Sequence, residues 1–217
     1  MSSLRALKYV AVFILPLAMV MSFASTGWLT WFPLILAFGI IPALELLFKP
    51  REENMSQMEE ELAKTDRTYD FVIYTSVLYQ YGFLIYFLYS VSQPDVALSD
   101  LLGRTMGMGI MCGVIGINVA HELGHRPKKY EQNMAKALLL TSLYMHFFIE
   151  HNRGHHKNVS TKEDPSSARY GEMLYSFWVR SVVFAYLSAW KLEAQRLRKK
   201  GKSALSLSNE MLQFQII

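Results

Sequence analysis

Two histidine-rich stretches, NVAHELGH at residues 118–125 and EHNRGHH at residues 150–156, decide how the rest of this chain is organised. Together with His146 they contain all six histidines of the sequence. A histidine beside apolar sequence is unfavourable unless its ring nitrogens find partners, so six of them at the edges of hydrophobic runs need a common explanation. A bound metal ion is the explanation that we expect.

The spacing of these histidines supports a metal site. Residues four apart lie on one face of an α-helix, so His121 and His125 can point at one ion. The same holds for His151 and His155. His156 is turned about 100° further around such a helix and would reach a second ion or close the site from the side. Neutral nitrogen ligands suit iron, zinc or copper better than magnesium or calcium.

Four apolar segments are long enough to cross a membrane as helices. A helix rises about 1.5 Å per residue, so about 20 residues cross roughly 30 Å of hydrocarbon. The first segment could be taken for a signal peptide, but its apolar run is long for one and a second span follows almost at once. In the last segment, Gly109-x-x-x-Gly113 permits a close approach of another helix, which makes room for a neighbouring helix or for a slender substrate. We predict spans at 7–24, 28–48, 71–91 and about 101–120.

Lysine and arginine fall on alternate sides of the predicted spans. The turns near residues 25–27 and 92–99 carry neither. By the positive-inside rule, the N-terminus, the loop 49–70 and both histidine stretches are therefore expected on the cytoplasmic side. The formal net charge of +4 then reflects membrane topology, and we expect no nucleic-acid partner. The basic residues concerned are Arg5, Lys8, Lys49, Arg51, Lys64, Arg67, Arg126, Lys128 and Lys129.

Residues 134–150 form a further apolar segment, which we do not expect to cross the membrane. If both histidine stretches hold the same metal centre, they must lie on the same side. The segment between them is therefore predicted to be a re-entrant or buried helix. His146, inside it, is one residue short of a same-face position with either stretch. We expect it to form hydrogen bonds, with metal ligation as the alternative.

A last helix is predicted after the second histidine stretch. Asp164-Pro165 has the form of a helix N-cap followed by proline at the first helical position. The helix would end at the basic residues 196–200, just before Gly201, which suits a helix C-terminus and an anionic lipid surface. The expected fold class is all-α integral membrane: about four transmembrane helices, one re-entrant or buried helix, and cytoplasmic or interfacial helices that carry the histidines.

Read alone, residues 121–125 have the form HExxH of the zinc proteases. In that pattern two histidines bind zinc and the glutamate between them acts as general base. An intramembrane zinc metalloprotease needs a third ligand from elsewhere and has no use for a second cluster of three histidines. A non-catalytic membrane protein that only binds or senses a metal is a further alternative, and the residues alone leave both open.

Read together, the two stretches resemble the histidine boxes of membrane-bound di-iron oxygenases, a group that includes fatty acid desaturases and hydroxylases. The longer patterns NxxHELGHRP at 118–127, HFFIEHNRGHH at 146–156 and TxEDPxxARxGE at 161–172 resemble the bacterial alkane 1-monooxygenase family. The likeness covers about 115–200 and includes a Glu-x-Gln-Arg-Leu segment at 193–197. The first hundred residues are similar only in topology.

This resemblance implies terminal hydroxylation of alkanes to 1-alkanols with O₂ at two iron ions, with electrons from rubredoxin, in the bacterial inner membrane. It also implies that the carboxylates of Glu122, Glu150 and Asp164 orient the ligand imidazoles. The family has further histidine boxes downstream, whereas this chain has no histidine after His156. We therefore expect residues 1–217 to be the N-terminal part of a single hydroxylase domain, incomplete as a catalyst. The iron ligands implied are His121, His125, His151, His155 and His156.

Overall fold

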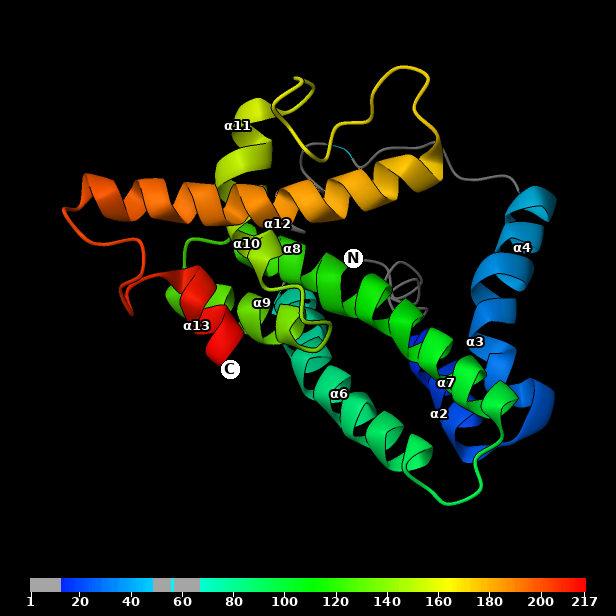
Figure 1. Cartoon of the computed structure of the whole chain (residues 1–217). Coiled ribbons are helices and arrows are strands. Elements are labelled where there is room, and N and C mark those ends of the chain that lie inside the picture. The colour runs from blue at the N-terminus through cyan, green and yellow to red at the C-terminus, as the bar shows by residue number, and fades with distance from the viewer. Residues whose placement is uncertain (1–12, 49–55, 57–66) are drawn as a thin grey trace. The chain divides into compact units, whose positions relative to one another are not determined.

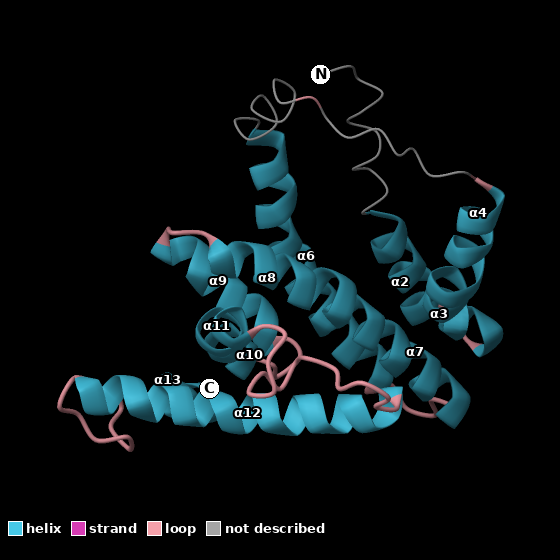
Figure 2. Cartoon of the chain, turned by 90° about the horizontal axis from the view of Figure 1, so that it is seen from above, coloured by secondary structure: helices cyan, strands magenta, loops and turns pink. Residues whose placement is uncertain are grey.

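A computed structural model describes residues 13–48, 56 and 67–217 of the chain. Every regular element within these residues is a helix, and turns and loops join the helices (Figures 1 and 2). The chain forms two compact units, Met1–Val119 and Ala120–Ile217. The all-helical architecture expected from the sequence is confirmed for the described residues.

Three helical stretches among the described residues are long and apolar enough to cross a membrane: Gly27–Leu47, Arg67–Val91 and Leu98–His125. They correspond to three of the four predicted spans, and they make this a membrane protein. The first predicted span, 7–24, is described only in part, as helix α2 (Ile14–Ala24), and residues 7–12 lie outside the described residues. Many apolar side chains on the three stretches are exposed, as expected of side chains that face lipid.

Local irregularities divide two of these stretches into shorter segments. Pro33 and Pro42 each lie in the first turn of a new segment, where a missing backbone N–H costs no hydrogen bond. The first stretch runs through η2 (Gly27–Trp31), α3 (Phe32–Ile35), η3 (Leu36–Ile40) and α4 (Ile41–Leu47). The second is the single helix α6 (Arg67–Val91), and the third runs through α7 (Leu98–Met111), η4 (Cys112–Ile117) and α8 (Asn118–His125).

Helix α7 packs closely against the first stretch at two glycines. A Cβ on Gly103 would lie 2.5 Å from the Thr30 hydroxyl oxygen, and one on Gly107 would lie 3.2 Å from the Pro33 ring. The close approach permitted at 109–113 is absent from the described residues, where a Cβ at either glycine would meet nothing within 4 Å. The tight helix contact therefore lies nearer the start of α7 than the spacing of small residues suggested.

Polar groups buried at the start of α7 fix the turns beside it. The Gly27 N–H donates to Asp100 Oδ1 (2.9 Å), and Gly27 has a positive φ of 68°, which a glycine adopts without strain. Arg104 donates to the backbone carbonyls of Ser25 (2.8 Å) and Ser90 (2.5 Å). These carbonyls lie at helix ends, where helical hydrogen bonds leave them free, so the buried arginine satisfies them.

The second unit combines one long helix with several short ones (Figure 1). They are α9 (Lys129–Leu140), α10 (His146–Glu150), η5 (His151–His155), α11 (His156–Asn158), α12 (Leu174–Lys199) and α13 (Glu210–Ile216). Helices α10 and α13 and the segment η5 all contact α12. Buried Ile149, Ala189 and Met211 bring α10, α12 and α13 into one small core, so the second histidine stretch lies against a packed surface.

The segment 134–150 is not the single helix that we predicted. Helix α9 ends at Leu140, the backbone turns with Leu143 at a φ of 55°, and α10 begins only at His146. Each piece is too short to span a membrane, since about 20 residues are needed. The apolar residues of the segment are instead buried within the unit, among them Leu138, Leu139 and Ile149.

The helix predicted to start at Asp164 begins only at Leu174. The Asp164 carboxylate accepts hydrogen bonds from the Ser166 N–H (2.9 Å) and from the Ser167 hydroxyl (2.6 Å). These bonds have the local pattern of a helix cap, but the chain continues as a loop up to α12. The prediction of an N-cap at Asp164 is therefore wrong.

The predicted end of this helix is confirmed. Helix α12 stops at Lys199, and Gly201 follows with a positive φ of 66°. The N–H groups of Gly201 and Lys202 donate to the carbonyls of Arg198 and Leu197, respectively, which is the Schellman arrangement of a helix end. The position of α12 at the membrane interface stays a prediction.

Candidate metal centre

The first histidine stretch is the end of a regular α-helix. Helix α8 ends at His125, and Pro127 discourages its continuation. The rings of His121 and His125 have their centroids 4.6 Å apart, in keeping with the four-residue spacing. Both side chains are exposed. Helix α8 therefore presents two imidazoles on one face of its last turns.

The second histidine stretch contains a π-helical turn, which we did not predict. The N–H of His156 donates to the carbonyl of His151, a bond of the i→i−5 type that defines the π-helix. In an α-helix, a residue five positions further on is turned about 140° away. The wider turn closes one residue later and brings His156 back beside His151, with ring centroids 4.6 Å apart. The structure thus pairs His151 with His156, whereas the α-helical spacing paired it with His155.

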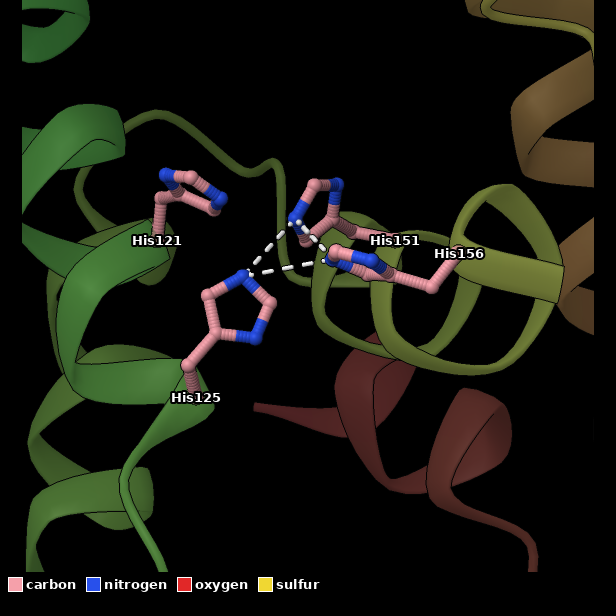
Figure 3. A group of neighbouring side chains, drawn as sticks. All are labelled: His121, His125, His151 and His156. Carbon is pink, nitrogen blue, oxygen red and sulfur yellow. Dashed lines mark hydrogen bonds between the residues drawn. The ribbon is translucent and has the colours of Figure 1, made fainter. Parts of the chain in front are cut away.

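Four histidines point toward one another: His121, His125, His151 and His156 (Figure 3). The Nε2 atoms of His125 and His156 each lie 3.1 Å from that of His151, and 3.4 Å from one another. Imidazole nitrogens bind a metal such as zinc at about 2.0–2.1 Å, so two ligands of one ion lie about 2.8–3.4 Å apart. One ligand atom from each of the four lies within 4.8 Å of the others. The arrangement fits the donor set of a single metal ion.

The environment of the cluster favours uncharged imidazole. Burial, and then four neighbouring histidines, lower the pKa of His151 to about 4. Protonation of two neighbouring rings would place two positive charges side by side, and like-charge repulsion opposes this. At neutral pH His151 is therefore a neutral nitrogen donor, the form that binds iron, zinc or copper.

His155 lies beside the cluster and contacts a buried carboxylate. Its Nδ1 lies 2.9 Å from Asp164 Oδ2, and the Asp164 side chain has no exposed surface. Burial alone would raise the pKa of Asp164, but hydrogen bonds from Ser167, Ser166 and His155 outweigh it and lower the pKa. An ionised Asp164 accepts the Nδ1 proton and leaves Nε2 as the acceptor nitrogen of His155, which is the arrangement found behind metal-binding histidines.

The part of the chain that carries the histidines is similar in sequence to known proteins. Residues 99–213, which contain both histidine stretches, match the fatty acid desaturase family. The chain belongs to this family. It is 37% identical over 196 residues to alkane 1-monooxygenase 1 of Alcanivorax borkumensis, which covers 89% of this chain and 48% of that protein. It is 35% identical over 220 residues to alkane 1-monooxygenase 2 of Pseudomonas aeruginosa, which covers 96% of this chain and 58% of that protein.

The resemblance to alkane 1-monooxygenases, within the fatty acid desaturase family, is thus confirmed. The chain spans about half the length of the curated relatives it matches. It is also 31% identical over 137 residues to the xylene/toluene monooxygenase hydroxylase component of Pseudomonas putida, which covers 62% of this chain and 36% of that protein. The histidine cluster is consistent with metal binding in a desaturase-like protein.

Two glutamates of this desaturase-family chain were predicted to orient imidazoles. Glu150 is buried beside the π turn, its Oε1 accepts from the Ser188 hydroxyl (3.2 Å), and burial raises its pKa. A Cβ on Gly154 would overlap this Oε1, so a larger residue there would displace the Glu150 carboxylate. Glu122 is exposed, and its carboxylate accepts from Arg126 (3.4 Å). An orienting role for either glutamate stays a prediction.

His146 lies outside the four-histidine cluster. It is buried, and its ring packs edge-on against Tyr144 and Tyr186, with centroids 4.5 and 5.3 Å away. The described residues offer its Nε2 no hydrogen-bond partner, and burial lowers its pKa. The hydrogen bond expected for His146 is therefore not found at this nitrogen, and the structure uses the ring for aromatic packing.

Two charged residues that the sequence analysis did not single out lie behind the second stretch. Arg153 of η5 donates to Glu193 of α12 (2.9 Å), whose side chain has no exposed surface. The sequence contained a signal for Glu193, because it interrupts an apolar series at four-residue spacing that forms the buried face of the helix. That face consists of Ala185, Ala189, Glu193 and Leu197.

Proposed function

We propose that this chain is part of a membrane-bound hydroxylase that converts alkanes to 1-alkanols with O₂. The observation that carries the proposal is the convergence of four imidazoles, three of them with Nε2 atoms 3.1–3.4 Å apart, at the end of a helix apolar enough to span a membrane. The named activity of the alkane 1-monooxygenases supports it. An alkane dissolves in lipid, so a site where a spanning helix ends is accessible to the substrate and to a soluble electron donor.

Iron is the metal that we propose, and when bound it would supply the activation of O₂. His155 would present its Nε2 to a second ion, with its Nδ1 proton held by Asp164. A two-iron centre needs more ligands than this chain contains, and the resemblance places them in histidine boxes further downstream. Residues 1–217 would then be the N-terminal part of a single hydroxylase domain. The ligands of the first ion would be His121, His125, His151 and His156.

Asp164 would orient a ligand, and the side of the membrane on which the histidines lie would decide which electron donor can reach them. Asp164 would fix which nitrogen of His155 faces the metal, by accepting the proton from the other. The distribution of lysine and arginine supports a cytoplasmic position of the histidines in the bacterial inner membrane. Rubredoxin is the electron donor that we propose for that side.

Metal analysis and product analysis test this function. We expect iron in the chain purified from membranes in detergent, and 1-octanol from octane when the chain is extended to the length of its relatives and given NADH, reductase and rubredoxin. His151→Ala should remove most of the iron. His146→Ala is the matched control, because His146 lies outside the cluster. One zinc ion per chain without hydroxylation would contradict the proposal and favour a zinc protease.

A further inference from the structure

A network of ion pairs ties the backbone between the cluster's ligands to three neighbouring helices. Arg153, in η5, donates from Nη1 to Glu193 Oε2 (2.9 Å) and from Nη2 to Glu210 Oε1 (3.2 Å). Glu210 Oε2 also accepts from Lys136 Nζ (3.3 Å). The network therefore connects η5 to α12 through Glu193, to α13 through Glu210 and to α9 through Lys136.

Glu193 is the most buried member of this network. In addition to Arg153, its carboxylate accepts from Arg196 Nε (2.7 Å) and Nη2 (2.5 Å), and from the Glu210 N–H (2.8 Å). Burial alone would raise the pKa of Glu193, but the hydrogen bonds from Arg196 and Glu210 outweigh it and lower the pKa. A buried carboxylate is unfavourable unless its oxygens are satisfied in this way, and loss of one partner leaves the remaining charges uncompensated.

Arg153 lies inside the turn whose register determines the cluster. His151 and His156 meet only because the backbone between them is π-helical. A π turn is rare, and the regular α-helix is its usual alternative. A return to α-helix would turn His156 about 140° away from His151. An ion pair on Arg153, in the middle of the turn, opposes that return.

Gly154, the residue after Arg153, also lies close to α12. A Cβ on Gly154 would overlap Glu150 Oε1 and would lie 3.0 Å from the Leu192 side chain. Gly154 thus leaves little room between η5 and α12, and Arg153, the residue before it, forms an ion pair with Glu193 of α12. Both contacts act on the short backbone segment that separates the two ligands.

We propose that Glu193 is a positioning residue of the metal centre: through Arg153 it holds the π turn that keeps His156 beside His151. This role rests on the proposed function, because it requires that the four-histidine cluster binds a metal. Glu193 acts on the ligands through the backbone of η5, so its effect is on ligand geometry.

Cobalt binding by the chain in detergent tests this role. Co²⁺ replaces iron or zinc at histidine sites, and its visible absorption reports the arrangement of the ligands. We expect Glu193→Gln and Arg153→Met each to weaken Co²⁺ binding by about tenfold or more, as is typical for residues that support metal ligands, and to change the absorption spectrum. Lys136→Gln is the matched control, since it removes an outer member of the network and leaves Arg153 paired; its affinity and spectrum should not change.

A double variant shows whether Glu193 acts through Arg153. If it does, Glu193→Gln combined with Arg153→Met should weaken binding no more than the larger single change. Losses that simply add would overturn the proposal. Should Glu193→Gln fail to fold, as judged by helix content, Arg153→Lys decides the matter, because lysine keeps the charge but cannot bridge both carboxylates with one planar group. Unchanged affinity and spectrum in both Arg153→Lys and Arg153→Met would overturn the proposal.

Failure of the proposed function has a different signature. It fails if the unmodified chain binds no Co²⁺, or if His151→Ala binds Co²⁺ as tightly as the unmodified chain. The positioning role alone fails if the unmodified chain binds Co²⁺ through His151 while Glu193→Gln keeps the same affinity and spectrum.

Discussion

The two histidine stretches bring their ligands together by different means. In the first, regular α-helical spacing is enough: Glu122, between the two ligands, is exposed and pairs with Arg126 just past the helix end, and Arg126 also pairs with Glu131. In the second, a π turn brings the ligands together, and Arg153, bonded to buried Glu193, lies between them. One stretch relies on local helical geometry and the other relies on its surroundings.

This difference predicts how each histidine stretch responds to substitutions in the residues around it. A regular helix end forms wherever its sequence favours a helix, so it tolerates changes in its neighbours. A π turn persists only where contacts around it favour the wider register. We therefore expect changes around the second stretch to have larger effects than equivalent changes around the first.

The largest effect is expected for His151→Ala. Its Nε2 lies 3.1 Å from the Nε2 atoms of both His125 and His156, so it joins the two stretches. Its loss should weaken metal binding by more than the roughly 10–100-fold typical of residues that only support ligands. His121→Ala should cost less, because His121 is the fourth member outside this triangle (Figure 3). Co²⁺ titration measures both, and an equal loss in the two variants would contradict the distinction.

The next largest effect is expected at one of two matching glycines. Gly124 and Gly154 occupy the same place in the motifs HELGH and HNRGH. A Cβ on Gly154 would overlap Glu150 Oε1, whereas one on Gly124 would lie 3.6 Å from the Phe148 ring, an ordinary contact. Gly154→Ala should therefore destabilise the fold by about 1–3 kcal/mol, the usual range for overpacking. Gly124→Ala should be neutral or stabilising by up to about 1 kcal/mol, because alanine is the better helix former.

Thermal unfolding in detergent, followed by circular dichroism, measures both glycine variants. Gly154→Ala should also weaken Co²⁺ binding more than Gly124→Ala does. If Gly124→Ala proved the more harmful of the two, the π turn would not be the sensitive element.

A smaller effect is expected from the carboxylates next to the histidines. Asp164→Asn would remove the charge that holds the Nδ1 proton of His155, and should weaken metal binding by about tenfold. Glu122→Gln should weaken binding less than Asp164→Asn, since Glu122 is exposed and bonded to Arg126. Co²⁺ titration of the two variants side by side is the measurement. A loss in Glu122→Gln equal to that in Asp164→Asn would mean that Glu122 supports the ligands as strongly as Asp164 does.

The smallest effect is expected from the ion pair between Arg180 of α12 and Glu172, beside the loop that carries Asp164. Arg180 donates to both oxygens of Glu172, at 2.6 and 2.8 Å, and to the carbonyls of Pro165 and Ser167. Hydrogen bonds from Arg180, followed by one from a backbone N–H, lower the pKa of Glu172 from 4.5 to about 2.

The lowered pKa of Glu172 fixes the sign of the pH dependence. The stabilisation from the pair is complete above about pH 4.5 and is lost as the pH falls toward 2. The metal-free chain should therefore lose more thermal stability over this range than Glu172→Gln, which lacks the carboxylate. Parallel curves would mean that the pair contributes nothing measurable to stability.

Features set by local pattern could be predicted from the sequence. Apolar runs of about 20 residues located three helices long enough to span a membrane, because the hydrocarbon thickness fixes that length. The four-residue spacing placed His121 beside His125, and Gly201 marked the end of α12. Each of these depends on neighbours within one or two helical turns.

Features set by contacts between segments could not be predicted in this way. The π turn at 151–156 forms against α12, where Glu193 and Leu192 meet it. The break at Leu143 separates two helices that a hydropathy count reads as one. Asp164 has the chemistry of a helix cap, but its place opposite His155 depends on the path of a loop. In each case tertiary contacts override a local preference.

The π turn also affects how such sequences are compared. It holds one residue more than the α-helical turn it replaces, and an insertion of one residue into a regular helix would rotate everything that follows by about 100°. Between His151 and His156 the extra residue is absorbed within the turn, and the imidazoles still face one another. An alignment of related histidine motifs should therefore allow a gap of one residue inside this helix, since the two spacings can present the same pair of ligands.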